Sequence, residues 1–276
     1  MIDMNTVVGH HDIVLMTLDT LRYDAACMAL KQGHTPHLAS ILPDGGWEER
    51  HSPGSFTWAA HWSFFAGFLP TPARPGRHAR LFAARFLGSE TTTAQTCVFD
   101  APDIVHGLAG RGYHTVCIGG VGFFNKQTPV GSALPALFAE SHWAPRLGVT
   151  DPDSTEHQFR LAAQILDAHA ASKRVFLFIN VSALHQPNRF YLEGCDCDTL
   201  ASHMAALAYV DRQLPILLRA LRRRGSAFCI LCSDHGTAYG EDGYTGHRLA
   251  HPTVWTVPYA HTLLTPEPSE QLDQIS

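Results

Sequence analysis

Four short apolar runs stand out along the chain. They occupy residues 13–18, 115–118, 175–179 and 228–232. Each is rich in β-branched and aromatic side chains, which favour strands. Each is too short to cross a membrane and has few polar positions, which is typical of a strand buried on both faces of a parallel sheet. The pattern therefore predicts four central parallel strands.

Helical periodicity fills the intervals between these runs. Apolar side chains recur at helical spacing in four segments, residues 57–66, 101–110, 154–172 and 200–224. Pro215 interrupts the last segment, so we expect a kink or a break there. Strands that alternate with helices predict the α/β class, with a mostly parallel central sheet and helices on both faces.

The chain length sets the number of domains. A chain of 276 residues fits one large domain or two small ones. Because no linker and no internal repeat interrupts the pattern, we predict a single domain over residues 1–265. Residues 266–276 are expected to form a polar C-terminal tail.

Polar side chains stand directly after the first and last apolar runs. Asp19 follows the first run, and Asp234 and His235 follow the last. The carboxyl ends of parallel strands meet at one edge of the sheet, where ligands bind, so these side chains are expected to converge. Two carboxylates and an imidazole suit Zn²⁺ or Mn²⁺ better than Ca²⁺. The alternative for Asp19 is the N-cap of a following helix, and Asp24 is expected on a helix surface or in a salt bridge.

A second candidate segment begins the helix predicted at residues 57–66. Ser55 or Thr57 can cap this helix, and Thr57 and His61 lie one turn apart on the same face. A hydroxyl at a helix N-terminus, beside a divalent cation, can lose its proton and attack a tetrahedral anion. The alternative is a plain capping threonine above an aromatic core helix.

Histidine is the compositional outlier, with 18 residues. Imidazole is a frequent metal ligand and proton carrier near neutral pH, although most of the 18 are expected to be structural or on the surface. His185 follows the third apolar run, and His247 lies in a glycine-rich loop. Both are candidates for a catalytic role, and a hydrogen-bonded loop histidine is the alternative for each.

Charge and the N-terminal sequence exclude several classes of protein. A net charge of −5 offers no basic surface for nucleic acid. The basic run at residues 222–224 is interpreted as a solvated helix end, where cations suit the helix dipole. The sequence has no basic leader and no run of about 20 apolar residues. We therefore expect no membrane partner and a cytoplasmic location.

The seven cysteines lack the spacing of a disulfide framework. Cys229 and Cys232 lie on one predicted strand and point to opposite faces, which predicts core residues. Cys195 and Cys197 lie in a polar loop and could bind a metal or form a disulfide.

Taken in order, these motifs resemble the alkaline phosphatase superfamily, in its sulfatase-like branch. The resemblance runs from about residue 12 to 262. The two metal motifs correspond to residues 18–24 and 233–236, and the nucleophile helix to residues 57–67. The substrate-side histidine motif corresponds to residues 184–187, the helix before the second metal motif to residues 210–212, and the late histidine and its following strand to residues 246–247 and 257–258. It implies an alkaline-phosphatase-like fold without the usual C-terminal subdomain. It also implies Thr57 as the nucleophile, with His61, His185 and His247 as catalytic residues, and a metal site formed by Asp19, Thr57, Asp234 and His235.

The sequence departs from sulfatases at several of these positions. Thr57 stands where sulfatases carry the Cys or Ser that is oxidised to formylglycine, so that modification cannot occur. Their sulfate-binding Lys and His fall at Gly120 and Gly122. Ala183 stands near the place of a second metal-binding Asp, which leaves one metal site firm and a second open. A threonine nucleophile resembles the phosphodiesterase and phosphotransferase relatives.

These observations predict a metal-dependent hydrolase of phosphoesters or related anionic esters. Its partner is expected to be a small anionic ester, and its oligomeric state stays open. Two alternatives remain, which are a phospho-group transferase with the same site and a non-catalytic metal- or anion-binding protein on this fold. The two glycines in place of sulfate contacts favour the second alternative.

Overall fold

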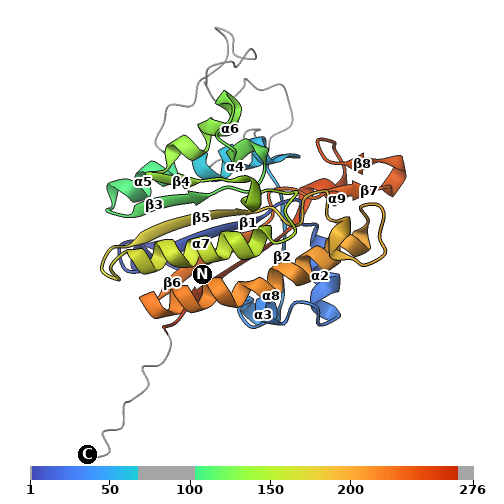
Figure 1. Ribbon diagram of the computed structural model, residues 1–276. Coiled ribbons are helices and arrows are strands. Elements are labelled where there is room, and N and C mark those ends of the chain that lie inside the picture. Colours follow the sequence, from blue (N-terminus) through green and yellow to red (C-terminus); the bar gives the residue numbers. More distant parts are fainter. Residues whose placement is uncertain (1, 68–102, 267–276) are drawn as a thin grey trace, which may run out of the picture.

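A mixed seven-stranded sheet forms the centre of the fold in the computed structural model, which describes residues 2–67 and 103–266 (Figure 1). The strand order is β2-β9-β6-β1-β5-β3-β4. The strands are β1 (Asp12–Leu18), β2 (Glu48–His51), β3 (His114–Ile118), β4 (Glu140–His142), β5 (Val175–Val181), β6 (Ala227–Cys232) and β9 (Thr256–Leu264). A separate two-stranded ribbon joins β7 (Ala238–Tyr239) and β8 (Thr245–Gly246).

The pairing of these strands is mostly parallel, as the sequence predicts. Central β1 pairs in parallel with β5 and β6, and β3 pairs in parallel with β5 and β4. Only β9 runs antiparallel within the described sheet, between β6 and β2. The four predicted strands correspond to β1, β3, β5 and β6, whereas β9 was indicated only through the resemblance and β2 and β4 were not predicted.

Helices cover both faces of the sheet (Figure 1). In the described residues the helices are α1 (Met4–Val7), α2 (Tyr23–Lys31), α3 (Pro36–Ala39), α4 (Thr57–Ala66), α5 (Ile104–Gly110), α6 (Pro129–Ala133), α7 (Ser154–Ala168), α8 (Leu200–Arg224) and α9 (Pro252–Trp255). None of them is long and apolar enough to cross a membrane. The predicted tail falls almost wholly beyond residue 266, outside the described chain.

Two hydrophobic clusters hold the layers together. On one face, α2, α3, α7 and α8 pack on Val14, Met16 and Leu18 of β1. On the other face, α4 and α5 pack on Ile13 and Leu15. Successive side chains of a strand point to opposite faces, so an uninterrupted apolar run supplies both clusters. This arrangement explains why β1 has no exposed position.

Several predicted helix boundaries need correction. Helix α8 continues through Pro215. Of the two expected outcomes, a kink or a break, the break is therefore wrong, because buried leucines on both sides of the proline anchor the helix to the sheet. Helix α7 ends at Ala168 because the backbone at His169 is extended. Helix α2 begins at Tyr23 with Arg22 as its N-cap, so Asp19 caps no helix. Asp24 forms the expected salt bridge, with Arg22 at 2.6 Å.

The interpretation of residues 222–224 as a solvated helix end is wrong for Arg224. This side chain is buried, and its Nε donates to Asp12 Oδ2 at 2.9 Å. Its Nη1 donates to the Leu166 carbonyl at 2.7 Å. Arg223, by contrast, is half exposed and pairs with Asp167 at the surface. One arginine of the run therefore joins the end of α8 to the start of β1 and the end of α7.

The cysteines behave largely as predicted. Cys229 and Cys232 are buried free thiols in the two different core clusters, which confirms them as core residues. Cys195 and Cys197 are also free, so the proposed disulfide is wrong. The Cys195 thiol instead donates to the Cys197 carbonyl, with 2.9 Å between sulfur and oxygen.

Candidate metal and catalytic site

The ends of β1 and β6 bring three predicted ligands together. Asp19, Asp234 and His235 are fully buried, and one ligand atom of each lies within 4.8 Å of the others. His235 Nε2 lies 3.5 Å from Asp234 Oδ2 and 3.9 Å from Asp19 Oδ1. Parallel pairing of β1 with β6 places the strand ends side by side, which is why residues so far apart in sequence meet.

The two carboxylates are suited to a bound cation. Asp19 Oδ1 and Asp234 Oδ2 have no hydrogen-bond partner in the described chain, although both are buried. Burial, followed by the charge of Asp234, raises the pKa of Asp19 above its ordinary value. Burial also raises the pKa of Asp234, to about 7. Two buried acids that face each other lack a countercharge, and a divalent cation between these oxygens would supply it.

His235 is held in the tautomer that a metal requires. Its Nδ1 donates to the Gly236 carbonyl at 2.9 Å, so its Nε2 carries the lone pair that faces the carboxylates. Gly236 itself packs against the backbone, since an added Cβ would lie 1.9 Å from the Thr253 carbonyl oxygen. The close approach of the Thr253 backbone therefore requires glycine at this position.

Thr57 begins α4 and points its hydroxyl at this cluster. Its Oγ1 lies 3.4 Å from Asp19 Oδ2 and 3.4 Å from His235 Nε2. The N-cap of α4 is Phe56, and no side chain caps the helix. The expectation that Ser55 or Thr57 caps α4 is therefore wrong, and so is the alternative that reads Thr57 as a plain cap. The hydroxyl is instead free to interact with whatever the carboxylates bind, beside the positive end of the helix dipole.

His61 is buried behind Thr57 and does not line the cavity in front of it. Its Nδ1 donates to the Thr57 carbonyl at 2.8 Å, and its Nε2 accepts from the Thr17 hydroxyl at 3.0 Å. Rings of Phe124 and Phe178 surround it. Burial lowers the pKa of His61 to about 3, so the ring is neutral. This geometry favours a role in orienting Thr57 over contact with an anion.

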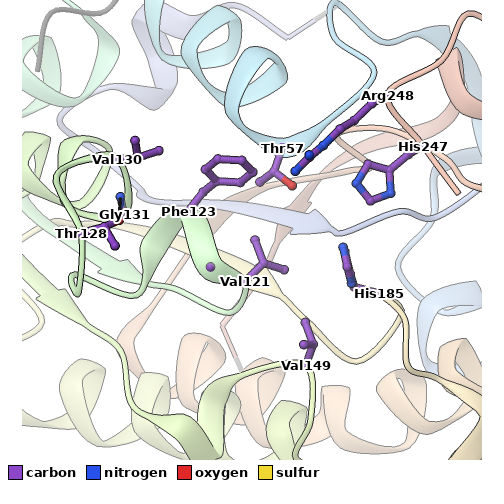
Figure 2. A pocket seen from close by; sticks show the side chains of 11 residues that line it. Thr57, Val121, Phe123, Thr128, Val130, Gly131, Val149, His185, His247 and Arg248 are labelled. Atoms are coloured by element: carbon purple, nitrogen blue, oxygen red, sulfur yellow. Dashed lines mark hydrogen bonds between the residues drawn. The ribbon is translucent and has the colours of Figure 1, made fainter. Parts of the chain in front are cut away.

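A cavity of about 310 Å³ opens in front of Thr57 (Figure 2). His185, His247 and Arg248 lie on one side of it. The other side is mostly apolar and is lined by Val121, Phe123, Val130 and Val149. The cavity thus combines a cationic and hydrogen-bonding side with an apolar one, and the threonine hydroxyl lies between them.

The two loop histidines are brought to the same place. The rings of His185 and His247 are 5.4 Å apart, and those of His235 and His247 are 4.6 Å apart. His185 Nδ1 donates to the Gln186 carbonyl at 2.7 Å, which leaves its Nε2 for the cavity. Burial, followed by the charges of His235 and His185, lowers the pKa of His247 to about 3. His247 is therefore a neutral hydrogen-bonding group.

Sequence reasoning missed three residues of this site. Asn180, in β5, donates to Asp19 Oδ2 at 2.9 Å. Thr20 adopts a positive φ of 66° and donates its backbone N–H to Asp234 Oδ1 at 3.2 Å. Arg248 faces the cavity and stacks over Phe56. An amide within an apolar strand was the available signal for Asn180, because a buried polar group requires partners.

The glycines that replace the sulfatase contacts differ in their surroundings. A Cβ at Gly120 would lie 2.4 Å from the Asn180 carbonyl oxygen, so no side chain fits without a shift of backbone. Gly122 lines the cavity and has open space, with the nearest atom of Asn125 at 3.9 Å. At position 120 the surrounding backbone therefore excludes any side chain. At position 122 a side chain would fit, and the contact is absent only because the residue is glycine.

Comparison with known proteins gives one family and one fold. The family model described as Sulfatase matches residues 11–261. No curated protein sequence matches. Among solved structures, the periplasmic domain of phosphoethanolamine transferase EptC from Campylobacter jejuni has 14% identity and a TM-score of 0.61, over 92% of this chain and 80% of that one.

Two further structures share this fold. The lipoteichoic acid synthase LtaP from Listeria monocytogenes has 13% identity and a TM-score of 0.62, over 95% of this chain and 67% of that one. A protein of the alkaline phosphatase superfamily from Vibrio parahaemolyticus has 13% identity and a TM-score of 0.56, over 94% of this chain and 62% of that one. At these identities the similarity shows the fold alone, which is the alkaline-phosphatase-like fold that the sequence predicts.

Proposed function

The chain belongs to the sulfatase family, and on that premise we propose that it is a metal-dependent phosphoester hydrolase in which Thr57 is the nucleophile. The observation that carries this proposal is the position of the Thr57 hydroxyl, 3.4 Å from both Asp19 Oδ2 and His235 Nε2. A hydroxyl that only capped a helix would have no reason to face a buried carboxylate and a buried imidazole.

Asp19, Asp234, His235 and Thr57 are the proposed metal ligands. Their mixture of oxygen and nitrogen donors fits Zn²⁺ or Mn²⁺, and the phosphoethanolamine transferase EptC from Escherichia coli has been crystallised as a zinc complex. When bound, such an ion lowers the pKa of a coordinated hydroxyl and neutralises charge on a phosphoryl group. Asn180 and Thr20 keep the two carboxylates in place through the hydrogen bonds described above.

The reaction proceeds in two displacements. The Thr57 oxygen forms a bond to phosphorus while the bond from phosphorus to the leaving oxygen breaks, which yields phosphothreonine and an alcohol. Water then attacks the phosphothreonine, releases phosphate and restores the Thr57 hydroxyl. Arg248 and neutral His247 face the cavity and hold the phosphoryl oxygens by charge and hydrogen bonding.

His185 is the proposed proton donor to the leaving oxygen. Its Nδ1 is fixed by the Gln186 carbonyl, so Nε2 is the nitrogen that exchanges a proton with the substrate. Positioned general acids of this kind typically contribute about 10²–10⁴-fold to the rate. His61 orients Thr57 from behind, through the carbonyl of that residue.

The cavity also supports a transferase as the second candidate. Val121, Phe123, Val130 and Val149 form an apolar wall beside Thr57, which suits an alcohol with an apolar body better than water. In that case the alcohol, rather than water, attacks the phosphothreonine. Product analysis in the presence of a competing primary alcohol distinguishes the candidates, because a transferase forms a new phosphoester and a hydrolase releases phosphate.

Substitution of Thr57 tests the covalent step. Thr57→Ala should reduce turnover of aryl phosphates to the background rate, because alanine has no oxygen to attack phosphorus. Thr57→Ser keeps a hydroxyl and should retain partial activity. Both variants should change the free energy of unfolding by only about 1 kcal/mol, which thermal denaturation measures. Rapid quenching of wild-type protein with radiolabelled substrate should trap phosphate on Thr57.

Two outcomes would contradict the proposal. Retention of most activity by Thr57→Ala would mean that water attacks phosphorus directly. Absence of turnover in wild-type protein loaded with Zn²⁺ or Mn²⁺, across a panel of phosphate mono- and diesters, would favour a non-catalytic binding protein. Thr115→Val is a matched control, since Thr115 is a buried strand threonine that hydrogen-bonds the Ala139 amide and lies outside the cavity lining.

A further inference from the structure

A second group of metal-ligating side chains lies at the opposite end of the sheet. His114 begins β3, Glu140 begins β4, and His169 directly follows α7. One ligand atom from each of these residues lies within 4.8 Å of the other two. The rings of His114 and His169 are 4.4 Å apart. Three segments that are distant in sequence thus converge on one point.

This group is separate from the proposed catalytic site. His114 pairs with Val175 at the start of β5, whereas Asp19 lies beside Val181 at its end. Six residues of strand at about 3.3 Å each separate the two groups by roughly 20 Å. Nothing in the proposed phosphoester chemistry uses these histidines.

The chemistry of the group matches a zinc site with three protein ligands. Two imidazoles and one carboxylate are a known ligand set for Zn²⁺, with bonds of about 2.0–2.2 Å. A tetrahedral ion at such distances separates its ligand atoms by roughly 3.4 Å. His114 Nε2 and Glu140 Oε2 lie 2.7 Å apart, so this pair needs to open slightly to admit an ion. All three side chains are partly exposed.

His142 supplies the hydrogen bond that ligating carboxylates commonly require. Its Nε2 lies 2.6 Å from Glu140 Oε1, while His114 Nε2 lies 2.7 Å from Oε2. Glu140 and His142 are two residues apart on β4 and therefore share a face of the strand. One carboxylate oxygen is thus oriented by His142, and the other faces the two remaining histidines, which is the usual arrangement around a bound metal.

The position of the group also favours a cation. His169 is the C-cap of α7, where the negative end of the helix dipole attracts positive charge. The backbone N–H of His114 donates to the Arg174 carbonyl at 2.8 Å, so the loop after α7 is already held against β3. An ion here would link this loop to β4, which is the edge strand of the sheet.

We propose that His114, Glu140 and His169 form a non-catalytic Zn²⁺ site with three protein ligands, with His142 orienting Glu140. The site fastens the edge of the sheet to the end of α7. It requires no contribution from the catalytic residues, and the catalytic site requires none from it.

Zinc stoichiometry measured in two backgrounds tests the proposal. Full-length, tag-free protein is stripped with a chelator, loaded with Zn²⁺, freed of excess ion by gel filtration and assayed for zinc. His169→Ala and Glu140→Gln are each compared with wild type, and again in an Asp234→Ala background that disables the catalytic site. Each variant should lose one Zn²⁺ per chain in both backgrounds, and His169→Ala should keep its phosphoesterase kcat within about twofold of wild type.

The matched control is His106→Ala. His106 also hydrogen-bonds a carboxylate, that of Asp103 at 2.7 Å, but belongs to no such cluster of three ligands in the described chain. It should lose no zinc. In the Asp234→Ala background, Zn²⁺ should raise the melting temperature, and His169→Ala should abolish that rise. Unchanged zinc content and zinc affinity in both His169→Ala and Glu140→Gln would overturn the proposal, whatever the outcome for the catalytic site.

Discussion

Asn180 connects three parts of the proposed catalytic site from within β5. Its amide Nδ2 donates to Asp19 Oδ2 at 2.9 Å, and to Thr17 Oγ1 at 3.3 Å. Its Oδ1 accepts from the backbone N–H of Val121, at the cavity wall, at 3.0 Å. Because Thr17 also donates to His61, the amide fixes both a proposed metal ligand and the residue behind the nucleophile.

Asn180→Ala should therefore weaken metal binding more than it weakens the fold. Loss of a residue that orients a ligand typically costs about 10–100-fold in metal affinity or activity. The free energy of unfolding should fall by about 1–3 kcal/mol, because buried partners lose their hydrogen bonds. Zinc titration and thermal denaturation measure the two effects. In a His169→Ala background, which leaves only the proposed catalytic zinc site, Thr115→Val should reproduce only the second effect. Equal zinc affinities of the two variants in that background would contradict this role for Asn180.

Gly120 and Gly122 lead to a prediction about substrate choice. The absence of a side chain at both positions removes the two contacts that sulfatases make to a sulfuryl group, whereas the proposed phosphoryl contacts of Arg248 and His247 remain. Hydrogen bonds to charged groups contribute about 1.5–3 kcal/mol each, which is roughly tenfold to hundredfold per contact. The kcat/KM for aryl phosphates should therefore exceed that for aryl sulfates by at least about tenfold. A higher rate with the sulfate would disprove the proposed substrate class.

The sequence could indicate Asp19, Asp234, His235 and Thr57 because each follows a simple local rule. Three stand at the carboxyl ends of apolar runs, and the fourth begins a helix. No local rule identifies the partners of Asn180 or Arg248, since these are supplied by other segments. His61 shows what a local rule leaves open. Helical spacing correctly placed it on the same face as Thr57, but only the packed aromatic rings show that it lies behind the hydroxyl.

Among the elements, the end of α8 is fixed by a single buried arginine. Arg224 pairs with Asp12 and donates to carbonyls at the end of α7 and in the following loop. Arg224→Met should lower the free energy of unfolding by about 3–5 kcal/mol, because it leaves Asp12 buried without its partner. Arg223→Met should cost less than about 1 kcal/mol, since its pair with Asp167 is half exposed. Denaturant titration of both variants checks this, and equal losses would rule it out.

Strand prediction succeeded where both faces are buried and failed at the edges. The runs that became β1, β3, β5 and β6 are apolar at nearly every position, so their own sequence is enough to identify them as buried strands. The residues of β2, Glu48–His51, are polar and mostly exposed, and they are a strand only because β9 pairs with them. Strand β4 has three residues, which is too short for a periodic signal. Edge strands are thus determined by their neighbours rather than by their own pattern.

At the scale of the whole molecule, the buried carboxylates link stability to metal and to pH. In metal-free protein, burial raises the pKa of Asp234 from its ordinary value of 3.8 to about 7. The folded state therefore keeps a proton on Asp234 up to about pH 7. The folded state thus binds more protons between these values, and its stability falls as the pH rises through this window. The free energy of unfolding should fall by a few kcal/mol across this window.

Melting temperatures in excess chelator test this relation. Wild type and Asp234→Asn should melt at similar temperatures near pH 4, and wild type should melt lower near pH 8, because only wild type then buries the additional charge. With saturating Zn²⁺ the order near pH 8 should reverse, since the wild-type carboxylate binds the ion. If the melting temperatures of wild type and Asp234→Asn differ by the same amount at every pH, with and without zinc, the coupling is refuted.

The central place of β1 in the sheet has a consequence for synthesis of the chain. Both neighbours of β1 come late in the sequence, β5 at residues 175–181 and β6 at residues 227–232. A ribosome that has made the first half of the protein has released Asp19 and Thr57 with no strand for β1 to join. Asp234 emerges only when most of the chain has left the exit tunnel. The nascent polypeptide therefore cannot yet form the proposed metal site, and we expect metal binding there only after β6 has been synthesised.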